Sequence, residues 1–257
     1  EYNQQVQAGV RLGFGAEWKI IEETPPRDIR VAFVQPGSNA AQVGMARGDR
    51  LLSVTVAGRQ VPVDDDSVAG KAVLNQVLGP SINGQSASLQ LRRADNTIRS
   101  VTVTVSPTTS QAVLVAKVLE TATTRIGYLV LNEFNAPAEA QIVAAFEQFR
   151  TQGVRDLVLD LRYNGGGYIY LASQLAYMVA GDGPTRNRVF DRLVYNDKRT
   201  RENVDTLFRS TTSGQPGSNI AGNQPLPTLG LSRVTVLTTV DTCSASESVI
   251  NGLRGVG

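Results

Sequence analysis

Residues 159–167 read LDLRYNGGG, a short apolar run that passes through polar residues into three consecutive glycines. The apolar part predicts a buried strand, and the largely apolar stretch 168–180 that follows predicts a helix. Three glycines in a row cost chain entropy, so a plain turn explains them poorly. The order strand, glycine turn, helix predicts a place where backbone N–H groups at a helix start can approach a negatively charged ligand.

The residues of this glycine turn leave three interpretations open. The turn donates hydrogen bonds to an oxyanion, binds phosphate, or only connects a strand to a helix. The pattern GxxxxGK[ST] of a phosphate-binding P-loop is absent, which counts against phosphate. We expect Asp160 and Arg162 to orient the turn rather than to react.

A second motif, TCSASE at 242–247, lies between an expected buried strand at 233–239 and an expected helix at 245–254. Ser244 and Glu247 fit a capping box, in which they bond each other's backbone at a helix start. The same position presents the Ser244 hydroxyl at a helix N-terminus, where the Ala245 amide can stabilise a developing oxyanion. Taken alone, the motif favours capping and catalysis equally.

The second half of the chain alternates β-type and α-type segments, which predicts an α/β core. The expected strands lie at 127–134 and 156–161, and the expected helix between them at 136–150. Residues 197–230 are polar and contain Gly and Pro without a clear period. We expect a partly ordered surface excursion or a mobile loop there.

The first half of the chain consists of short β-type runs separated by turn signals, which predicts a small β-rich domain. The expected strands are 29–34, 51–56, 87–91 and 98–105, and the expected short helices are 39–44 and 67–78. The polar segment SPTTSQ at 106–111 then predicts a linker.

Residues 11–15 read RLGFG, with two glycines around an aromatic residue. Such a loop can aim several backbone N–H groups in one direction and hold the C-terminal carboxylate of a peptide. The residues that follow can then offer a sheet edge to the same peptide. By itself, the motif favours a plain β-turn, in which glycine supplies positive φ.

Composition excludes several classes of function. With 25 basic and 23 acidic residues among 257, the charge balance makes no case for nucleic acid or membrane-surface binding. No apolar run is long enough to span a membrane. Histidine is absent, which excludes Ser-His-Asp, Cys-His and His-metal chemistry within these residues. A base would have to be a lysine, a carboxylate or a group from elsewhere. The single cysteine, Cys243, either pairs outside this segment or is a small buried apolar residue.

Together the motifs resemble a known family. The RLGFG loop, QPGSNAA at 35–41 and GMARGDRLLSV at 44–54 resemble a PDZ domain over residues 9–105, with an atypical insertion, VPVDDDS, at 61–67. The DLRYNGGG turn and the SASE helix start resemble the catalytic domain of the C-terminal-processing (tail-specific) serine proteases. A PDZ domain upstream is usual in that family.

The resemblance implies a two-domain fold. After an N-terminal segment, residues 1–8, it places a small β-rich PDZ-like domain at 9–105 and a linker at 106–114. An α/β ClpP/crotonase-like protease core, incomplete at its C-terminus, occupies 115–257. The implied nucleophile is Ser244, and the implied oxyanion donors are the amides of Ala245 and Gly166. The implied peptide-binding residues are Leu12, Gly13, Phe14 and Gly15.

The resemblance also implies a general-base lysine in a Gly-Lys turn after the serine. None of Lys19, Lys71, Lys117 and Lys198 matches that position, so we expect the base beyond Gly257 and this segment alone to be inactive. No metal or cofactor is implied. The implied partners are protein or peptide substrates bound through their C-termini, and the implied location is a bacterial periplasm or cell envelope. Two alternatives stay open: an inactive peptide-binding scaffold and an acyl-thioester enzyme of the same general fold.

Overall fold

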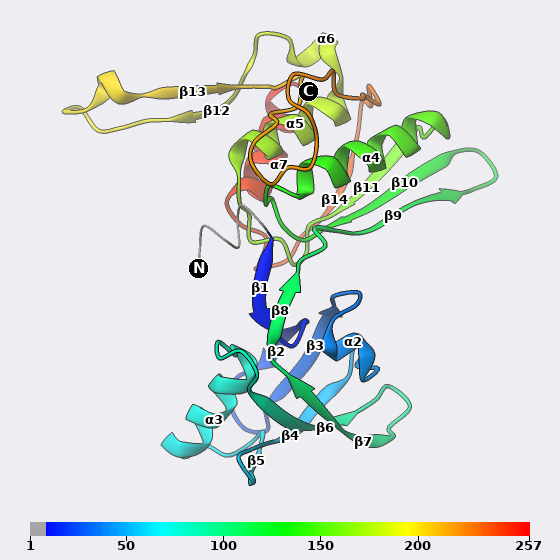
Figure 1. The fold of residues 1–257 in the computed structure, drawn as a ribbon. Helices are drawn as coiled ribbons and strands as arrows, with labels where there is room; N and C mark the ends of the chain where they lie inside the picture. The colour runs from blue at the N-terminus through cyan, green and yellow to red at the C-terminus, as the bar shows by residue number, and fades with distance from the viewer. Residues whose placement is uncertain (1–8) are drawn as a thin grey trace. The chain divides into compact units, whose positions relative to one another are not determined.

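The computed structural model describes residues 9–257, so the expected N-terminal segment 1–8 lies outside the described residues (Figure 1). The chain divides into two compact units. One runs from Val10 to Ser110, and the other contains Gly9 and Gln111–Gly257. The first unit is rich in β-strands, and the second is a mixed α/β unit.

An antiparallel sheet forms the first unit, with strand order β2-β3-β4-β6-β7. Alternation along β6 buries Ala87, Leu89 and Leu91, which pack with Phe14 and Leu51 in one core. The strands of this sheet are β2 (Ala16–Glu22), β3 (Asp28–Val34), β4 (Arg50–Val56), β6 (Ser86–Arg92) and β7 (Ile98–Thr104), and β5 (Arg59–Pro62) pairs with β4.

Two short helices complete the first unit, as the sequence predicts. Helix α2 (Asn39–Gln42) is capped by Ser38, whose side chain accepts the Ala41 N–H at 3.2 Å. Helix α3 (Val68–Leu78) is capped by Ser67, which accepts the Gly70 N–H at 3.0 Å. Serine at both N-caps satisfies backbone donors that have no partner inside the helix.

Residues 106–114 were expected to form a linker, but part of this range is a strand. Strand β8 (Ser106–Thr109) pairs antiparallel with β1 (Val10–Gly13), and Leu12 lies opposite Pro107. The proline is tolerated in this two-stranded ladder because one side of each strand is an edge. Strand β9 (Val113–Glu120), which the sequence did not predict, starts inside the same range.

The second unit is built on a four-stranded sheet with strand order β14-β11-β10-β9. Strand β10 (Arg125–Leu131) runs parallel to β11 (Asp156–Asp160), which runs parallel to β14 (Thr235–Leu237). The carboxyl ends of these three strands therefore meet at one edge of the sheet. The principal helices are α4 (Ala138–Thr151), α5 (Ile169–Ala180) and α7 (Ala245–Gly255).

Helix α5 packs against both α4 and α7 (Figure 1). Phe146, Phe149 and Leu159 are fully buried in the core beneath these helices. The apolar stripe predicted on α4 explains this, since Ile142, Phe146 and Phe149 recur at helical spacing and are buried.

One expectation for the second unit was wrong, and another is narrowed to one of its two alternatives. The strand predicted as buried at 233–239 is the short edge strand β14, with exposed and half-buried side chains. Residues 197–230 form the partly ordered surface excursion, since β13 (Val204–Leu207) pairs with β12 (Val189–Leu193) in a ribbon that projects from the unit (Figure 1). Within the described residues, no helix is long and apolar enough to cross a membrane.

Candidate active site

Ser244 lies where the chain turns from the segment after β14 into α7, and its backbone is strained. Its φ is 54° and its ψ is −120°. The other described non-glycine residues with positive φ are Ala57 and four asparagines, and asparagine tolerates this region better than most residues. A conformation of this kind costs about 1–3 kcal/mol and persists only where surrounding structure enforces it.

The start of α7 supports the strained serine. The Ser244 N–H donates to Glu247 Oε2 at 2.8 Å, so Ser244 is the N-cap residue, as predicted. Among the described residues, the Ala245 N–H donates to no acceptor. This amide points from a helix N-terminus, where unpaired N–H groups carry partial positive charge.

Gly166 lies directly against Ser244. A β-carbon on Gly166 would stand 2.7 Å from Ser244 Cβ and 3.0 Å from the Ala245 nitrogen, and its φ is +107°. Gly167 has a φ of +136°, and a β-carbon there would collide with the Phe134 carbonyl. Of the three glycines in this turn, only Gly165 has open space around the position of a β-carbon. The second and third glycines of the turn are therefore required by close approach and by positive φ.

Asn164 joins the glycine turn to two neighbouring segments. It is fully buried. Its Oδ1 accepts the Gly166 N–H at 2.9 Å, and its Nδ2 donates to the Leu131 carbonyl at the end of β10 at 3.0 Å. Its own carbonyl accepts the Cys243 N–H at 3.3 Å and the Ser246 hydroxyl at 3.0 Å. The Gly166 N–H, expected to be an oxyanion donor, is thus already hydrogen-bonded to Asn164.

An ion pair fixes the entry to the glycine turn. Arg162 contacts Asp160 through Nε–Oδ1 at 2.9 Å and Nη2–Oδ2 at 2.6 Å, and the Tyr128 hydroxyl donates to Asp160 Oδ2 at 2.8 Å. Burial alone would raise the pKa of Asp160, but hydrogen bonds from Arg162 and Tyr128 outweigh it and lower the pKa. Asp160 stays ionised at neutral pH and, as expected, orients the strand end.

Threonines tie the serine segment to the same strand end. The Thr242 hydroxyl donates to the Leu161 carbonyl at 2.8 Å, and the Thr239 hydroxyl donates to the Arg162 carbonyl. Together with Asn164 and Ser246, these side chains were not singled out from the sequence. Asn164, Thr242 and Ser246 lie inside the two motifs and Thr239 just before the second, but the partners of all four lie far along the chain.

Cys243 is exposed next to Ser244, so the interpretation as a buried apolar residue was wrong. No described lysine or carboxylate hydrogen-bonds the Ser244 hydroxyl. Lys117 on β9 stands 5.8 Å from the centre of the Tyr128 ring, and Lys198 is exposed in the β12–β13 ribbon. Among the described residues, no group of three or more His, Cys, Asp or Glu side chains could hold a metal.

The predicted peptide-binding loop lies at the start of β2, the terminal strand of its sheet. Leu12 and Gly13 end β1, Phe14 is buried in the core, and Gly15 has a φ of +80°. The carbonyl of Phe14 accepts the Ala40 N–H at 2.9 Å. In the described chain, no loop or turn hydrogen bond uses the Phe14 or Gly15 N–H as donor.

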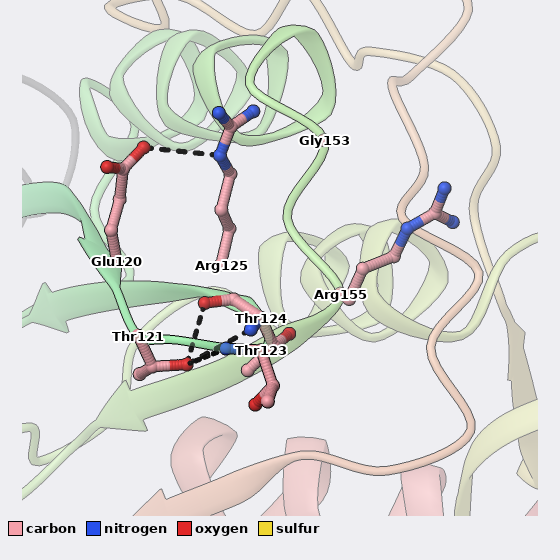
Figure 2. Close-up of a pocket in the computed structure, with 7 residues that line it drawn as sticks. All are labelled: Glu120, Thr121, Thr123, Thr124, Arg125, Gly153 and Arg155. Carbon is pink, nitrogen blue, oxygen red and sulfur yellow. Dashed lines mark hydrogen bonds and ion pairs between the residues drawn. The ribbon is translucent and has the colours of Figure 1, made fainter.

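A shallow hollow lies elsewhere in the second unit, at the turn between β9 and β10 and the starts of β10 and β11 (Figure 2). Arg125 and Glu120 form an ion pair of 3.2 Å at its rim, and the Thr121 hydroxyl accepts the Thr124 N–H at 3.0 Å (Figure 2). Because Arg125 begins a parallel strand whose carboxyl end leads toward the glycine turn, this hollow is at the opposite edge of the sheet from Ser244.

Comparison with known proteins assigns the second unit to a protein family. The model of peptidase family S41 matches residues 125–257, more than half of the chain. The chloroplastic C-terminal processing peptidase of Tetradesmus obliquus is 32% identical over 163 residues, covering 61% of this chain and 34% of that protein. The carboxyl-terminal-processing protease of a Picosynechococcus species is 27% identical over 168 residues, covering 65% of this chain and 37% of that protein.

A solved structure shares the mixed α/β fold. A protein from Bacteroides fragilis assigned to the S41 proteases superposes with a TM-score of 0.66 at 26% identity, covering 96% of this chain and 62% of that one. The chain spans about a third of the length of the two curated relatives named above.

Proposed function

This chain belongs to peptidase family S41, and from that premise we propose that it is part of a serine endopeptidase that cleaves proteins near unstructured C-termini. Ser244 is its nucleophile. The observation that carries this proposal is the strained backbone of Ser244, pressed against Gly166 at the start of α7. Helix capping alone does not account for the strain, since Ser38 and Ser67 cap helices with ordinary extended backbones.

The proposed reaction is acyl transfer in two steps. Ser244 Oγ attacks the carbonyl carbon of the scissile amide while a base takes the hydroxyl proton. The C–N bond then breaks, the proton passes to the leaving amine, and water hydrolyses the resulting ester to free Ser244. The carbonyl oxygen carries negative charge in the tetrahedral intermediate of each step, and the unpaired Ala245 N–H at the helix start is suited to stabilise it.

Gly166 is the proposed second oxyanion donor. The α-carbon of Gly166 faces Ser244 Cβ and the Ala245 nitrogen, so the backbone of this residue lies beside the proposed nucleophile. Because its N–H already donates to Asn164 Oδ1, the oxyanion would share this donor with the asparagine. Two backbone donors at fixed positions would stabilise the transition state without reorganising during the reaction.

The proposed base is a lysine outside residues 1–257, in a Gly-Lys turn of the whole protein. It must be neutral to accept the Ser244 proton, which requires partial burial to lower its pKa. No step of this chemistry requires a metal or an organic cofactor. We place the protein in a bacterial periplasm or cell envelope, which fractionation of cells producing the whole protein tests.

We further propose that the first unit is a PDZ-like domain that presents substrate tails. The N–H groups of Phe14 and Gly15 would hold the terminal carboxylate, and the peptide would add to the open edge of β2. Leu12, which precedes β2, and Ile20, within β2, support this assignment, because these large apolar side chains are 38% and 42% exposed. The second unit would correspond to the ClpP/crotonase-like core.

Cleavage of a disordered tail tests the function. The whole protein is incubated with a substrate that carries an unstructured C-terminal extension, beside the same protein with Ser244→Ala. We expect cleavage only with the intact serine and tail binding with both. Tail binding without cleavage by either protein would favour the inactive scaffold, and cleavage by Ser244→Ala at the unchanged rate would refute Ser244 as nucleophile.

A further inference from the structure

A buried asparagine connects the three segments that make up the candidate active site. Asn164 contacts the end of β10 through Leu131, the glycine turn through Gly166, and the serine segment through Cys243 and Ser246. No part of its side chain is exposed. These three segments are far apart in sequence, so their relative positions depend on contacts of this kind.

Both ends of the Asn164 carboxamide are satisfied, at 2.9 Å to Gly166 and 3.0 Å to Leu131. Burying a polar group is unfavourable unless its hydrogen bonds are made, so this arrangement has one preferred orientation. A carboxamide that is fixed at both ends fixes the backbone of Gly166 in turn. Gly166 then has little freedom to move away from Ser244.

We propose that Asn164 is a positioning residue for acyl transfer, whose buried carboxamide sets the place of the Gly166 N–H relative to Ser244. This inference rests on the proposed function. Asn164 does not contact the substrate; it acts through the glycine turn. The other polar side chains of this region brace the strand end without bonding Gly166: Asp160 bonds Arg162 and Tyr128, and Thr242 bonds the Leu161 carbonyl.

The first test compares Asn164→Ala with a matched control. Asn164→Ala releases Gly166 and should lower kcat about 10²–10³-fold with KM changed little, the range seen when one oxyanion donor is lost. Asn132→Ala removes another buried asparagine side chain from the segment after β10, one whose Nδ2 has no partner. It creates a comparable cavity but leaves the bonds to Gly166 in place, so its kcat should stay near wild type.

The rates are expressed per active site, counted by irreversible phosphonate labelling of Ser244. This separates positioning from folding, because a purely structural defect lowers the number of active molecules and not the kcat of each one. Thermal unfolding of both variants confirms that they are compared in the folded state.

A second variant, Asn164→Asp, adds a readout that depends on pH. The introduced carboxyl keeps an acceptor for Gly166, but only its protonated form can also donate to the Leu131 carbonyl. Burial should raise its pKa above that of an ordinary aspartate. The kcat of this variant relative to wild type should therefore rise as pH falls, and the base's own titration cancels in the ratio.

The inference is supported if Asn164→Ala loses kcat, Asn132→Ala does not, and the Asn164→Asp ratio rises toward low pH. It is overturned if Asn164→Ala turns over at the wild-type rate per labelled site, or if both alanine variants lose kcat equally. Either result leaves Ser244 chemistry intact. A wild-type protein that neither labels nor cleaves would refute the proposed function and this inference with it.

Discussion

Gly166 and Ser244 are in such close contact that a β-carbon on Gly166 would stand 2.7 Å from Ser244 Cβ. The contact joins the end of β11 to the start of α7, and it leaves the Ala245 N–H beside the same glycine. A site of this kind tolerates little change in the backbone of either segment.

Gly166→Ala should abolish most activity and destabilise the protein. A side chain at positive φ costs roughly 1–2 kcal/mol before any clash is counted. The matched control is Gly165→Ala, which has open space and no left-handed φ and should behave like wild type. Turnover and chemical unfolding of the two variants check this, and equal effects would argue against the contact.

Ser244→Gly should be more stable than Ser244→Ala, although both are inactive. Both remove the hydroxyl, but only glycine relieves the strain of φ 54° and ψ −120°. The gain from relieved strain exceeds the extra entropy of the unfolded glycine chain, leaving a difference of about 0.5–1 kcal/mol. Thermal unfolding measures it, and an alanine variant at least as stable as the glycine variant would count against a strained nucleophile.

Asp160→Asn should lower the free energy of unfolding at neutral pH. It should also make that free energy fall less steeply as the pH decreases. The pKa of Asp160 is lower in the folded than in the unfolded protein, so its contribution is present above the unfolded pKa. It is lost as pH falls through the folded pKa. Because Arg162 is part-exposed, we expect the substitution to lower the free energy of unfolding by about 1–2 kcal/mol, less than the loss of a fully buried pair would.

Urea unfolding between pH 7 and pH 3 tests this prediction. Asp205→Asn is the control, since it breaks the exposed pair with Arg192 and should have a smaller effect. If the stability curves of Asp160→Asn and wild type ran parallel down to low pH, the ionised pair would not be what stabilises the strand end.

Glu139→Ala should loosen the long segment between β13 and β14. This carboxylate on α4 is buried, and it accepts the Ser213 N–H at 2.5 Å, the Ser213 hydroxyl at 2.7 Å and Gln174 Nε2 at 2.7 Å. Its removal leaves the Ser213 donors and one of the two Gln174 Nε2 hydrogens unpaired, because Gln174 keeps its bond to the Thr211 carbonyl. We expect the free energy of unfolding to fall by about 1–3 kcal/mol. Limited proteolysis should then cut near Ser213 faster, whereas Glu147→Ala, from an exposed pair with Arg150, should not change the cutting pattern.

The sequence predicted the principal helices and many of the strands because their patterns are local, whereas β2 and β9 were not predicted. Ser67 before an apolar period and Ser244 before Glu247 mark helix starts at short range, and both are N-caps. The β12–β13 ribbon escaped prediction because its strands are short and a register shift between Val189 and Asp191 interrupts their alternation. Strand β14 was predicted as a buried strand because an apolar run does not reveal how many neighbouring strands cover it.

The candidate site was predictable in its residue types and not in its connections. Two motifs, the glycine turn and the TCSASE segment, marked the region. The need for glycine at 166, however, comes from Ser244, which is distant in sequence. The role of Asn164 likewise depends on Leu131 and Cys243, whose approach is decided by parallel strand pairing. Such non-local contacts leave no local pattern.

The most direct measurement is mass spectrometry of the whole protein after treatment with a serine-directed phosphonate, beside its Ser244→Ala variant. A strained serine at an oxyanion site should give a single adduct, on the peptide that contains Ser244, and none in the variant. An unmodified Ser244 in a protein that still cleaves disordered tails would contradict the account.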